Sequence, residues 1–238
     1  DVKAEYLFSE SYVLYLHALG GRELNDYRRL NAFSPYWSLN ARMPSTYVPL
    51  NATLGFKASP VNGLWFNVFG GYRISKDELF CNLVDADGYY FTHFLQDKAK
   101  TAYGGAELKY GYKDWFDASL KGTFYSWKTD NENEELYLVT KPKFELNFYA
   151  EAKVFEGLKV NLGYEYVQRK EYEIEEEKSS RDFGLGNISN LSVGASYTFL
   201  KDLSVFGRVN NLLNKQYYYE YGYPAEKLNV LAGLSLAF

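Results

Sequence analysis

The hydrophobic pattern of this chain repeats every two residues over most of its length. Between positions 143 and 154, the even positions hold aromatic and aliphatic residues, whereas the odd positions begin with Lys143, Glu145 and Asn147. A period of two places the two sets on opposite faces of a β-strand. Because the apolar sets contain no charge, the pattern predicts strands with one apolar and one polar face. The same alternation occurs at 48–57, 116–125, 158–165, 191–199 and 228–238.

The connections between these segments alternate in length. The segment from Ala4 to Leu19 is apolar on both faces, so we expect either an edge strand or a strand buried on both sides. The whole pattern predicts about ten long antiparallel strands, with both termini on the short-turn side. Short turns with Gly, Asn, Asp or Pro are expected at 59–63, 113–114, 156–157 and 201–202. Long polar connections are expected near 20–45, 84–89, 129–136, 173–186 and 219–226.

Short turns at one end and long loops at the other are typical of outer-membrane β-barrels. We therefore expect an all-β, antiparallel transmembrane barrel over residues 1–238, with short periplasmic turns and long extracellular loops. Its expected location is the outer membrane of a Gram-negative bacterium. A membrane-spanning helix is not expected, because no run of about 18 apolar residues occurs. A soluble β-sandwich or propeller is the alternative, and the uninterrupted apolar faces argue against it.

The composition adds three points to this picture. Aromatic residues make up 19% of the chain, with 24 Tyr and 17 Phe, and Tyr at this density suits a membrane–water interface. A formal charge of −4 gives no reason to expect a nucleic-acid partner. Cys81 is the single cysteine, so no disulfide can form within the chain.

The chain opens without a signal peptide, which we expect to be removed or outside this sequence.

The C-terminal segment carries a motif. It reads Val-Asn-Asn-Leu-Leu-Asn-Lys-Gln-Tyr at 209–217, followed by Gly-Tyr-Pro at 222–224 and a closing strand. Over about 203–238 this resembles the C-terminal end of TonB-dependent outer-membrane receptors. In that family, the Asn-Leu-x-Asn turn precedes the last extracellular loop, and the Gly-x-Pro element leads into the final strand. The resemblance implies solute or nutrient binding and uptake across the outer membrane.

The chain also departs from the family. A family receptor has a TonB-contacting segment and a plug domain inside a barrel of about 22 strands. Neither is expected here, so TonB is implied as a partner only through a plug that this chain lacks. We expect either the C-terminal part of a larger barrel or a plugless relative that closes as a smaller one.

The last strand also resembles the signal by which the barrel-assembly machinery recognises its substrates. Any amphipathic last strand would show a similar alternation of apolar residues, but the aromatic residue at the end of the chain favours the signal. The expected partners are therefore this machinery, outer-membrane lipid and lipopolysaccharide. The residues that carry the resemblance are Leu231, Gly233, Leu236 and Phe238.

Charged residues recur on the polar faces of the predicted strands. In a wide barrel they would line an aqueous path, and their excess of bases would favour anionic solutes. In a barrel closed from about ten strands, acids and bases would pair and fill the lumen. The predicted lumen-lining residues are Lys57, Arg73, Glu107, Lys109, Asp117, Lys121, Lys143, Glu145, Glu151, Lys153, Lys159, Glu165 and Arg208.

The predicted loops carry two further kinds of residue. Acidic runs at 130–135 and 173–177 are interpreted as solvated loop charge, because neither has the spacing of a dedicated calcium site. The first loop mixes cations with aromatic rings, which suits either ligand capture at the barrel mouth or a loop that packs on itself. Its candidate ligand residues are Arg22, Tyr27, Arg28, Arg29, Tyr36 and Trp37.

The chain offers little for catalysis. His17 and His93 are the two histidines, and neither stands in a recognisable nucleophile motif. We therefore expect no enzyme, no catalytic residue, no metal site and no cofactor. Two functions stay open at this point: solute binding and uptake, or a structural or adhesive barrel with a filled lumen and no transport.

Overall fold

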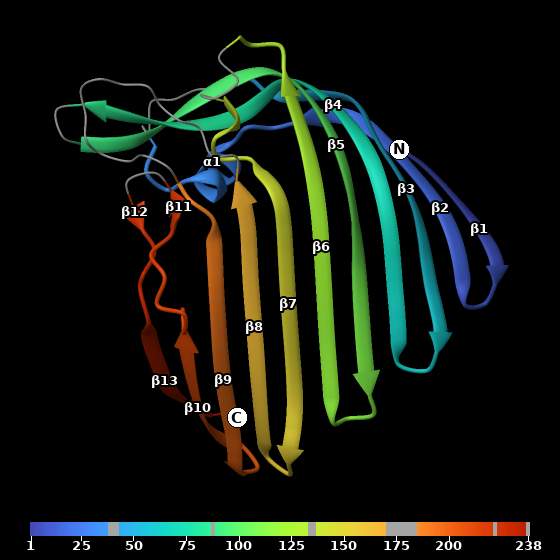
Figure 1. Cartoon of the computed structure of the whole chain (residues 1–238), viewed down its shortest axis with the longest axis vertical. Coiled ribbons are helices and arrows are strands. Elements are labelled where there is room, and N and C mark those ends of the chain that lie inside the picture. The colour runs from blue at the N-terminus through green and yellow to red at the C-terminus, as the bar shows by residue number, and fades with distance from the viewer. Residues whose placement is uncertain (38–42, 87–88, 133–136, 170–184, 221–222, 237–238) are drawn as a thin grey trace.

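The computed structural model describes residues 1–37, 43–86, 89–132, 137–169, 185–220 and 223–236. In this part of the chain, eleven strands form one antiparallel sheet in the order β1 to β10 and then β13, while β11 and β12 form a separate hairpin (Figure 1). None of the described helices is long and apolar enough to cross a membrane. The elements are β1 (Val2–Ser9), β2 (Tyr12–Glu23), α1 (Tyr27–Phe33), β3 (Thr46–Val61), β4 (Leu64–Ala86), β5 (Tyr89–Tyr112), β6 (Phe116–Thr129), β7 (Pro142–Phe155), β8 (Leu158–Arg169), β9 (Ile188–Leu200), β10 (Leu203–Asn210), β11 (Tyr218–Glu220), β12 (Tyr223–Pro224) and β13 (Asn229–Leu236).

The predicted turns are confirmed, and they gather at the lower end of the sheet in Figure 1. The structure has one strand more than expected because a tight turn at Glu10 and Ser11 divides the Ala4–Leu19 segment into β1 and β2. Both faces of this segment are apolar, so no break in the period marks the turn. The expectation that both termini lie on the short-turn side is therefore wrong: the N-terminus lies toward the long-loop end (Figure 1).

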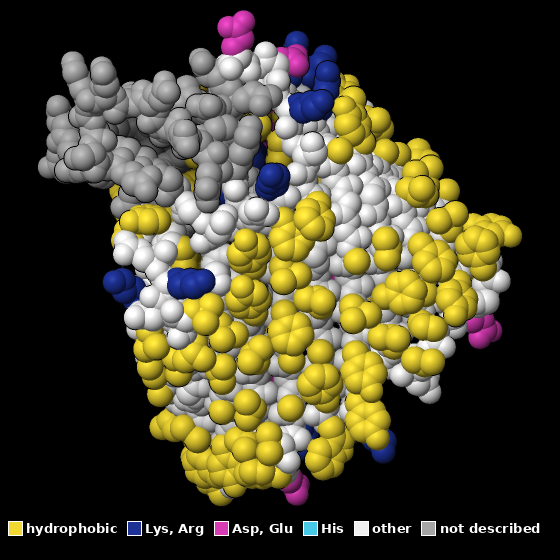
Figure 2. Space-filling view, in the orientation of Figure 1, with side chains coloured by type: hydrophobic (Ala, Val, Ile, Leu, Met, Phe, Trp, Pro, Cys, Tyr) yellow, Lys and Arg dark blue, Asp and Glu magenta, His cyan; other side chains and the backbone are white. Residues whose placement is uncertain are grey.

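The register joins the apolar residues of successive strands into a continuous surface. One row runs Leu108, Leu120, Phe148, Tyr164 and Leu191 across β5 to β9, each residue opposite the next. Equivalent rows extend to β1 and to β13. Figure 2 shows that apolar side chains dominate the convex face of the sheet. The predicted division into one apolar and one polar face is confirmed.

The two outer strands of the sheet are far apart. Figure 1 shows β1 and β13 at opposite sides of the curved sheet. Among the described residues, no ladder pairs these two strands. The sheet is thus an open, curved wall with one edge on β1 and the other on β13, and a barrel would need further strands to pair both edges.

The strands β4 and β5 are much longer than a membrane crossing requires, with 23 and 24 residues. Their pairing is irregular between Ser75 and Glu78, and Asp77 there has a φ of 55°. Beyond this bulge the hairpin bends over α1 (Figure 1). A second irregularity, between Tyr47 and Leu50, removes Val48 from the outward apolar set in which the alternation placed it, and Val48 is buried.

The buried core lies under this bent hairpin rather than along the wall. One apolar cluster joins α1 to β4 and β5, and a second joins β4 and β5 to the connection before β7. The members of the first cluster are Leu30, Leu79, Cys81 and Phe94, packed by Phe33, Trp37 and Met43. Those of the second are Phe80, Ala99 and Leu138, packed by Leu95, Trp127 and Tyr137.

Candidate functional site

The residues predicted to line the lumen share the polar, concave face of the sheet. In register, Glu107 lies opposite Lys121, whereas Asp117 lies opposite Glu151. The face therefore mixes complementary and like-charged neighbours. Lys143 lies at an irregularity between Pro142 and Phe144, and the other predicted residues follow the regular register.

Toward the short-turn end of this face, two ion pairs are exposed to solvent. Lys109 Nζ lies 2.9 Å from Glu107 Oε1, and Lys159 Nζ lies 2.9 Å from Glu151 Oε1. Both lysine side chains are more than half exposed, at 57% and 56%. In this part of the described face, the charges do not form the filled, cross-paired interior that a small closed barrel would require.

Tyrosines stiffen the concave face between β2 and β5. The Tyr103 hydroxyl donates to Asn51 Oδ1 at 2.9 Å and lies 2.6 Å from Thr53 Oγ1. Its ring lies over Gly71, where a Cβ atom would approach the ring to 2.3 Å. The glycine is needed for this close approach, and the ring covers the gap that it leaves in the strand.

At the long-loop end, the concave face carries a cluster of charges that we call the mouth cluster: Glu23, Arg29, Arg73, Glu78 and Lys141. Arg73 donates to both carboxylate oxygens of Glu23, at 2.8 and 3.1 Å, and to Glu78 at 3.2 Å. Arg29 pairs with Glu23 at 2.7 Å. The hydrogen bond from Arg73 holds the pKa of Glu23 below its ordinary value. Helix α1 positions Arg29, since Asp26 caps the helix by accepting from the Arg29 backbone N–H.

Lys141 is the most enclosed cation of the mouth cluster, with 11% of its side chain exposed. Its Nζ lies 3.7 Å from Glu78 Oε1 and 4.8 and 4.9 Å from the ring centroids of Trp127 and Phe80. Burial lowers the pKa of Lys141, and the charge of Glu78 opposes that shift. The faces of the two rings attract the buried ammonium and so help to hold its charge in this position.

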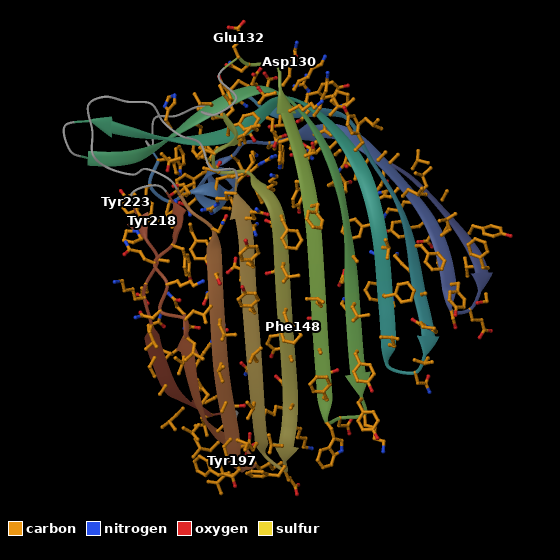
Figure 3. All side chains as sticks on the ribbon, in the orientation of Figure 1. Asp130, Glu132, Phe148, Tyr197, Tyr218 and Tyr223 are labelled. Atoms are coloured by element: carbon orange, nitrogen blue, oxygen red, sulfur yellow. The ribbon has the colours of Figure 1, made fainter. Side chains whose placement is uncertain are left out.

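A cavity of about 260 Å³ opens beside Lys141. Above it, the Tyr219 hydroxyl donates to Glu165 Oε2 at 2.7 Å, and burial together with this bond raises the pKa of Tyr219. Tyr219 belongs to β11, whose hairpin with β12 Figure 3 places at the long-loop end through Tyr218 and Tyr223. The cavity lining consists of Phe33, Leu79, Cys81, Trp127, Thr140, Lys141, Pro142 and Tyr219.

The predicted first-loop ligands separate in the structure. Tyr27 and Trp37 pack on each other at 5.6 Å between ring centroids, and Trp37 also contacts Phe94 at 5.9 Å. Tyr36 stacks on Tyr223 of the last connection. The loop thus packs on itself and on its neighbours, as one of the two interpretations expected. Arg28 is exposed on α1, Arg29 joins the mouth cluster, and Arg22 lies on the outer face beside Tyr47.

The predicted assembly residues lie on both faces of β13. Leu236 shares the outward face with Leu234, whereas Leu231 stands opposite Arg208 and Gly233 opposite Phe206 on the concave face. Phe238 lies outside the described residues. Of the predicted signal residues described, Leu236 therefore faces outward, whereas Leu231 and Gly233 face the concave side.

The acidic runs and the histidines form no further site in the part of the chain described. Asp130 pairs with Lys98 at 3.6 Å, and Figure 3 places Asp130 and Glu132 at the long-loop end. Residues 133–135 and 173–177 lie outside the described residues. His17 lies 2.8 Å from Asp1, and His93 is exposed on β5. No group of three His, Cys, Asp or Glu among the described residues could hold a metal ion.

Sequence reasoning missed most of the mouth cluster. Its members Glu23, Glu78 and Lys141 lie at strand ends or in the bent hairpin, where the two-residue period breaks down, and Trp127 beside Lys141 lies near the end of β6. Only Arg73 and Arg29 were predicted site residues. One signal in the sequence is Lys141 between Thr140 and Pro142, a cation beside a residue that favours strand starts, but it does not specify burial.

No family model and no curated protein matches the chain. Solved structures do match. The pyoverdine outer-membrane receptor FpvA of Pseudomonas aeruginosa has a TM-score of 0.69 at 16% identity, covering 99% of this chain and 35% of that receptor. The chain shares the fold of part of the barrel wall of TonB-dependent receptors.

Two further receptors show the same likeness. The ferric-catecholate import receptor Fiu of E. coli has a TM-score of 0.64 at 15% identity, covering 99% of this chain and 34% of the receptor. The copper transporter OprC has a TM-score of 0.65 at 12% identity, covering 99% and 38%. The chain thus spans between a third and two fifths of the length of these receptors. At such identities the likeness shows the fold, and these neighbours are transporters and receptors rather than enzymes.

Proposed function

We propose that this chain forms part of the wall and mouth of an outer-membrane receptor of a Gram-negative bacterium, which binds a solute at the mouth cluster and takes it up. The observation that carries the proposal is the cavity beside Lys141 and Trp127, at the long-loop end of a polar concave face. A transporter needs this arrangement, because a solute must be recognised outside the membrane before it enters an aqueous path.

The charge of the mouth cluster favours an anionic solute. Its three cations, Arg29, Arg73 and Lys141, stand against the two carboxylates of Glu23 and Glu78, which leaves one net positive charge. The solved neighbours are named for a ferric catecholate, for pyoverdine and for copper. We therefore propose a metal chelate with an anionic periphery and aromatic rings as the solute class, recognised by Lys141 and Trp127 together.

The remaining predicted roles support this arrangement. The charged residues of the concave face, from Lys57 to Arg208, would line the path below the mouth. The edges of β1 and β13 would pair with further strands, and a plug with its TonB contact would belong to that larger assembly. Outer-membrane lipid would cover the convex apolar face, and the barrel-assembly machinery would insert the protein.

Uptake by cells that produce the full protein tests this proposal. Initial uptake of ⁵⁵Fe-labelled catecholate and hydroxamate chelates and of copper would be measured for the wild type, for Lys141→Met and for Trp127→Ala. We expect uptake of one of these probes, with a loss of about tenfold or more in both variants. Tyr112→Ala, at the short-turn end, is the matched control and should leave uptake unchanged.

The surface amount of each variant would be measured in parallel by antibody binding to intact cells. If the wild type reaches the surface but takes up none of the probes above background, the uptake proposal fails. If uptake occurs but both mouth variants match the wild type, the mouth cluster is not the solute site. The structural or adhesive barrel with a filled lumen is the second candidate, and the open sheet edges argue against it.

A further inference from the structure

Five basic side chains gather on the outer face of the wall, on strands that neighbour one another. On β2 to β4, Arg22 pairs in register with Tyr47, and Tyr47 pairs with Lys76. Both cations lie over the Tyr47 ring, at 5.5 and 5.9 Å from its centroid. On β5 and β6, Lys100 stands directly opposite Lys128. The basic row, as we call it, consists of Arg22, Lys76, Lys98, Lys100 and Lys128, all exposed.

The basic row lies just beyond the apolar band on the long-loop side. On β6, Lys128 follows Phe124 by four residues on the same face, which is about 14 Å along a strand. Phe124 packs on Phe144 at 4.3 Å and Phe144 on Tyr166 at 6.2 Å, so aromatic rings border the band there. Figure 2 shows basic side chains near the upper border of the apolar face. In a membrane this height corresponds to the lipid headgroups.

The charges of the basic row are poorly balanced within the chain. Lys100 and Lys128 are directly opposed, and like charges in this position destabilise a sheet. In the part of the chain that the structure describes, Asp130 is the one carboxylate that pairs with the row, at 3.6 Å from a Lys98 side chain that is 63% exposed. The concave face, by contrast, pairs Lys109 with an acid at 2.9 Å. An anion from outside the chain would offset the repulsion.

An apolar hollow of about 670 Å³ lies on the same strands, below the basic row. Its floor is low because Gly104, Ala106 and Gly122 carry little or no side chain, while Phe124 and Phe144 form part of its rim. Gly104 follows Lys100 by four residues on β5 and shares its face. A cationic rim above an apolar hollow on one outward surface matches the two parts of a phospholipid-like molecule.

We propose that the basic row binds the phosphate groups of a phosphorylated lipid of the surrounding leaflet, with one acyl chain of that lipid in the hollow. The lysine ammonium groups supply point charges for phosphate oxygens, and the Arg22 guanidinium supplies a planar donor pair. The proposal rests on the membrane placement of the proposed function and not on solute uptake. A receptor without transport would still bind the lipid.

Lipid binding to the purified full protein in detergent micelles tests the proposal. The probes are bisphosphorylated lipid A, the same lipid without its phosphates, and inorganic phosphate, with binding measured by native mass spectrometry. We expect Lys100→Gln combined with Lys128→Gln to weaken binding of bisphosphorylated lipid A at least fivefold and to leave the dephosphorylated lipid unaffected. Lys113→Gln combined with Lys201→Gln removes the same charge at the short-turn end and should change neither.

A second variant tests the hollow separately. A Cβ at Gly122 would meet its nearest atom at 3.5 Å, an ordinary contact, so Gly122→Leu can begin its side chain there without strain and extend it into the hollow. It should weaken binding of both lipid forms. Equal lipid A binding by the Lys100/Lys128 variant and its control, at equal folded fraction by circular dichroism, would overturn the proposal. Inorganic phosphate binding as tightly as lipid A would also overturn it, since the row would then be a site for free anions.

Discussion

Tyr36 stacks face to face on Tyr223, with 3.5 Å between the ring centroids and 5° between the ring planes. Tyr36 belongs to the first long connection and Tyr223 to the last, so the contact joins the two ends of the wall at the mouth. The carbonyl of Tyr36 also accepts the Thr92 backbone N–H at 2.7 Å, which ties the same point to the β4–β5 hairpin. Three segments that are distant in sequence therefore hold one another over the concave face.

Removal of this stack should loosen the mouth and leave the wall intact. We expect Tyr223→Ala to cost about 1 kcal/mol of local stability, since an aromatic pair contributes about that much beyond its buried area. Hydrogen exchange should rise over 27–37, while the strands of the wall keep wild-type protection. Tyr223→Phe keeps the ring and should therefore keep the protection that the stack gives to 27–37. Uniformly faster exchange over the whole sheet would instead make the stack part of the global fold.

The orientation of the wall can be tested on two adjacent residues of β7. Leu146 faces outward opposite Gly122, and Asn147 faces the concave side opposite Lys121. Arg at Leu146 should cost on the order of 2–4 kcal/mol if the residue lies near the bilayer midplane, whereas Arg at Asn147 should cost much less. Reversible unfolding in lipid vesicles measures both. Similar losses at the two positions would rule out a membrane-facing convex surface.

The mouth cluster should make the protein sensitive to loss of Arg73. Arg73→Met leaves Glu78, with 7% of its side chain exposed, without its nearest cation, and breaking a buried pair in this way costs about 3 kcal/mol or more. Denaturant unfolding at neutral pH measures the loss. Arg28→Met, on the exposed side of α1, is the control and should change stability by less than about 0.5 kcal/mol. A loss as small as that of the control would show that the pair is solvated.

The same cluster predicts a direction for acid stability. Because the pKa of Glu23 is lower in the folded protein than in the unfolded chain, its ionised form stabilises the fold above the unfolded pKa. That contribution is lost as the pH falls through the folded pKa. Arg73→Met should therefore reduce the fall in the free energy of unfolding that Glu23 contributes as the pH is lowered. An unchanged pH dependence of this free energy would contradict the pairing.

The strands of the wall and their apolar face were predictable because side chains alternate along a strand with a period of two residues. The even positions from Phe144 to Ala152 face outward because a strand alternates its side chains, and the register is regular over these residues. The division of Ala4–Leu19 into two strands was not predictable. Both faces of this segment are apolar, so no break in the period marks the turn at Glu10 and Ser11. Val48 departs from the alternation because a bulge shifts its register.

The site was less predictable because it depends on contacts between distant segments. Lys141 is buried only because the β4–β5 hairpin bends over it and brings Phe80 and Glu78 to it. That bend follows from a bulge at Lys76 and Asp77, which no local pattern marks. Arg22 was expected at the mouth and instead faces outward, because its neighbour Glu23 takes the concave side and pairs with Arg73.

The terminal residue Phe238 should matter more for assembly than for stability. The prediction follows from the resemblance of the last residues to an assembly signal, since Phe238 itself lies outside the described residues. Its deletion should lower the amount in the outer membrane several-fold while the yield of refolding in detergent stays near the wild type. Leu231→Ala, which shortens a side chain within β13, is measured in the same two ways for comparison. Parallel losses in cells and in detergent would point to simple destabilisation.

The open edges of the sheet lead to the last prediction. Strands β1 and β13 each expose one unpaired edge among the described residues, and an unpaired edge binds other strands. The purified 238-residue chain should therefore give no stable single-channel steps as a monomer in planar bilayers and should associate through these edges. Conductance and mass in the same lipid are measured together. A monomer with a large, stable conductance would show that the chain closes by itself around an open lumen. A closed, silent monomer would favour the filled structural barrel, and uptake by this chain alone would then be withdrawn.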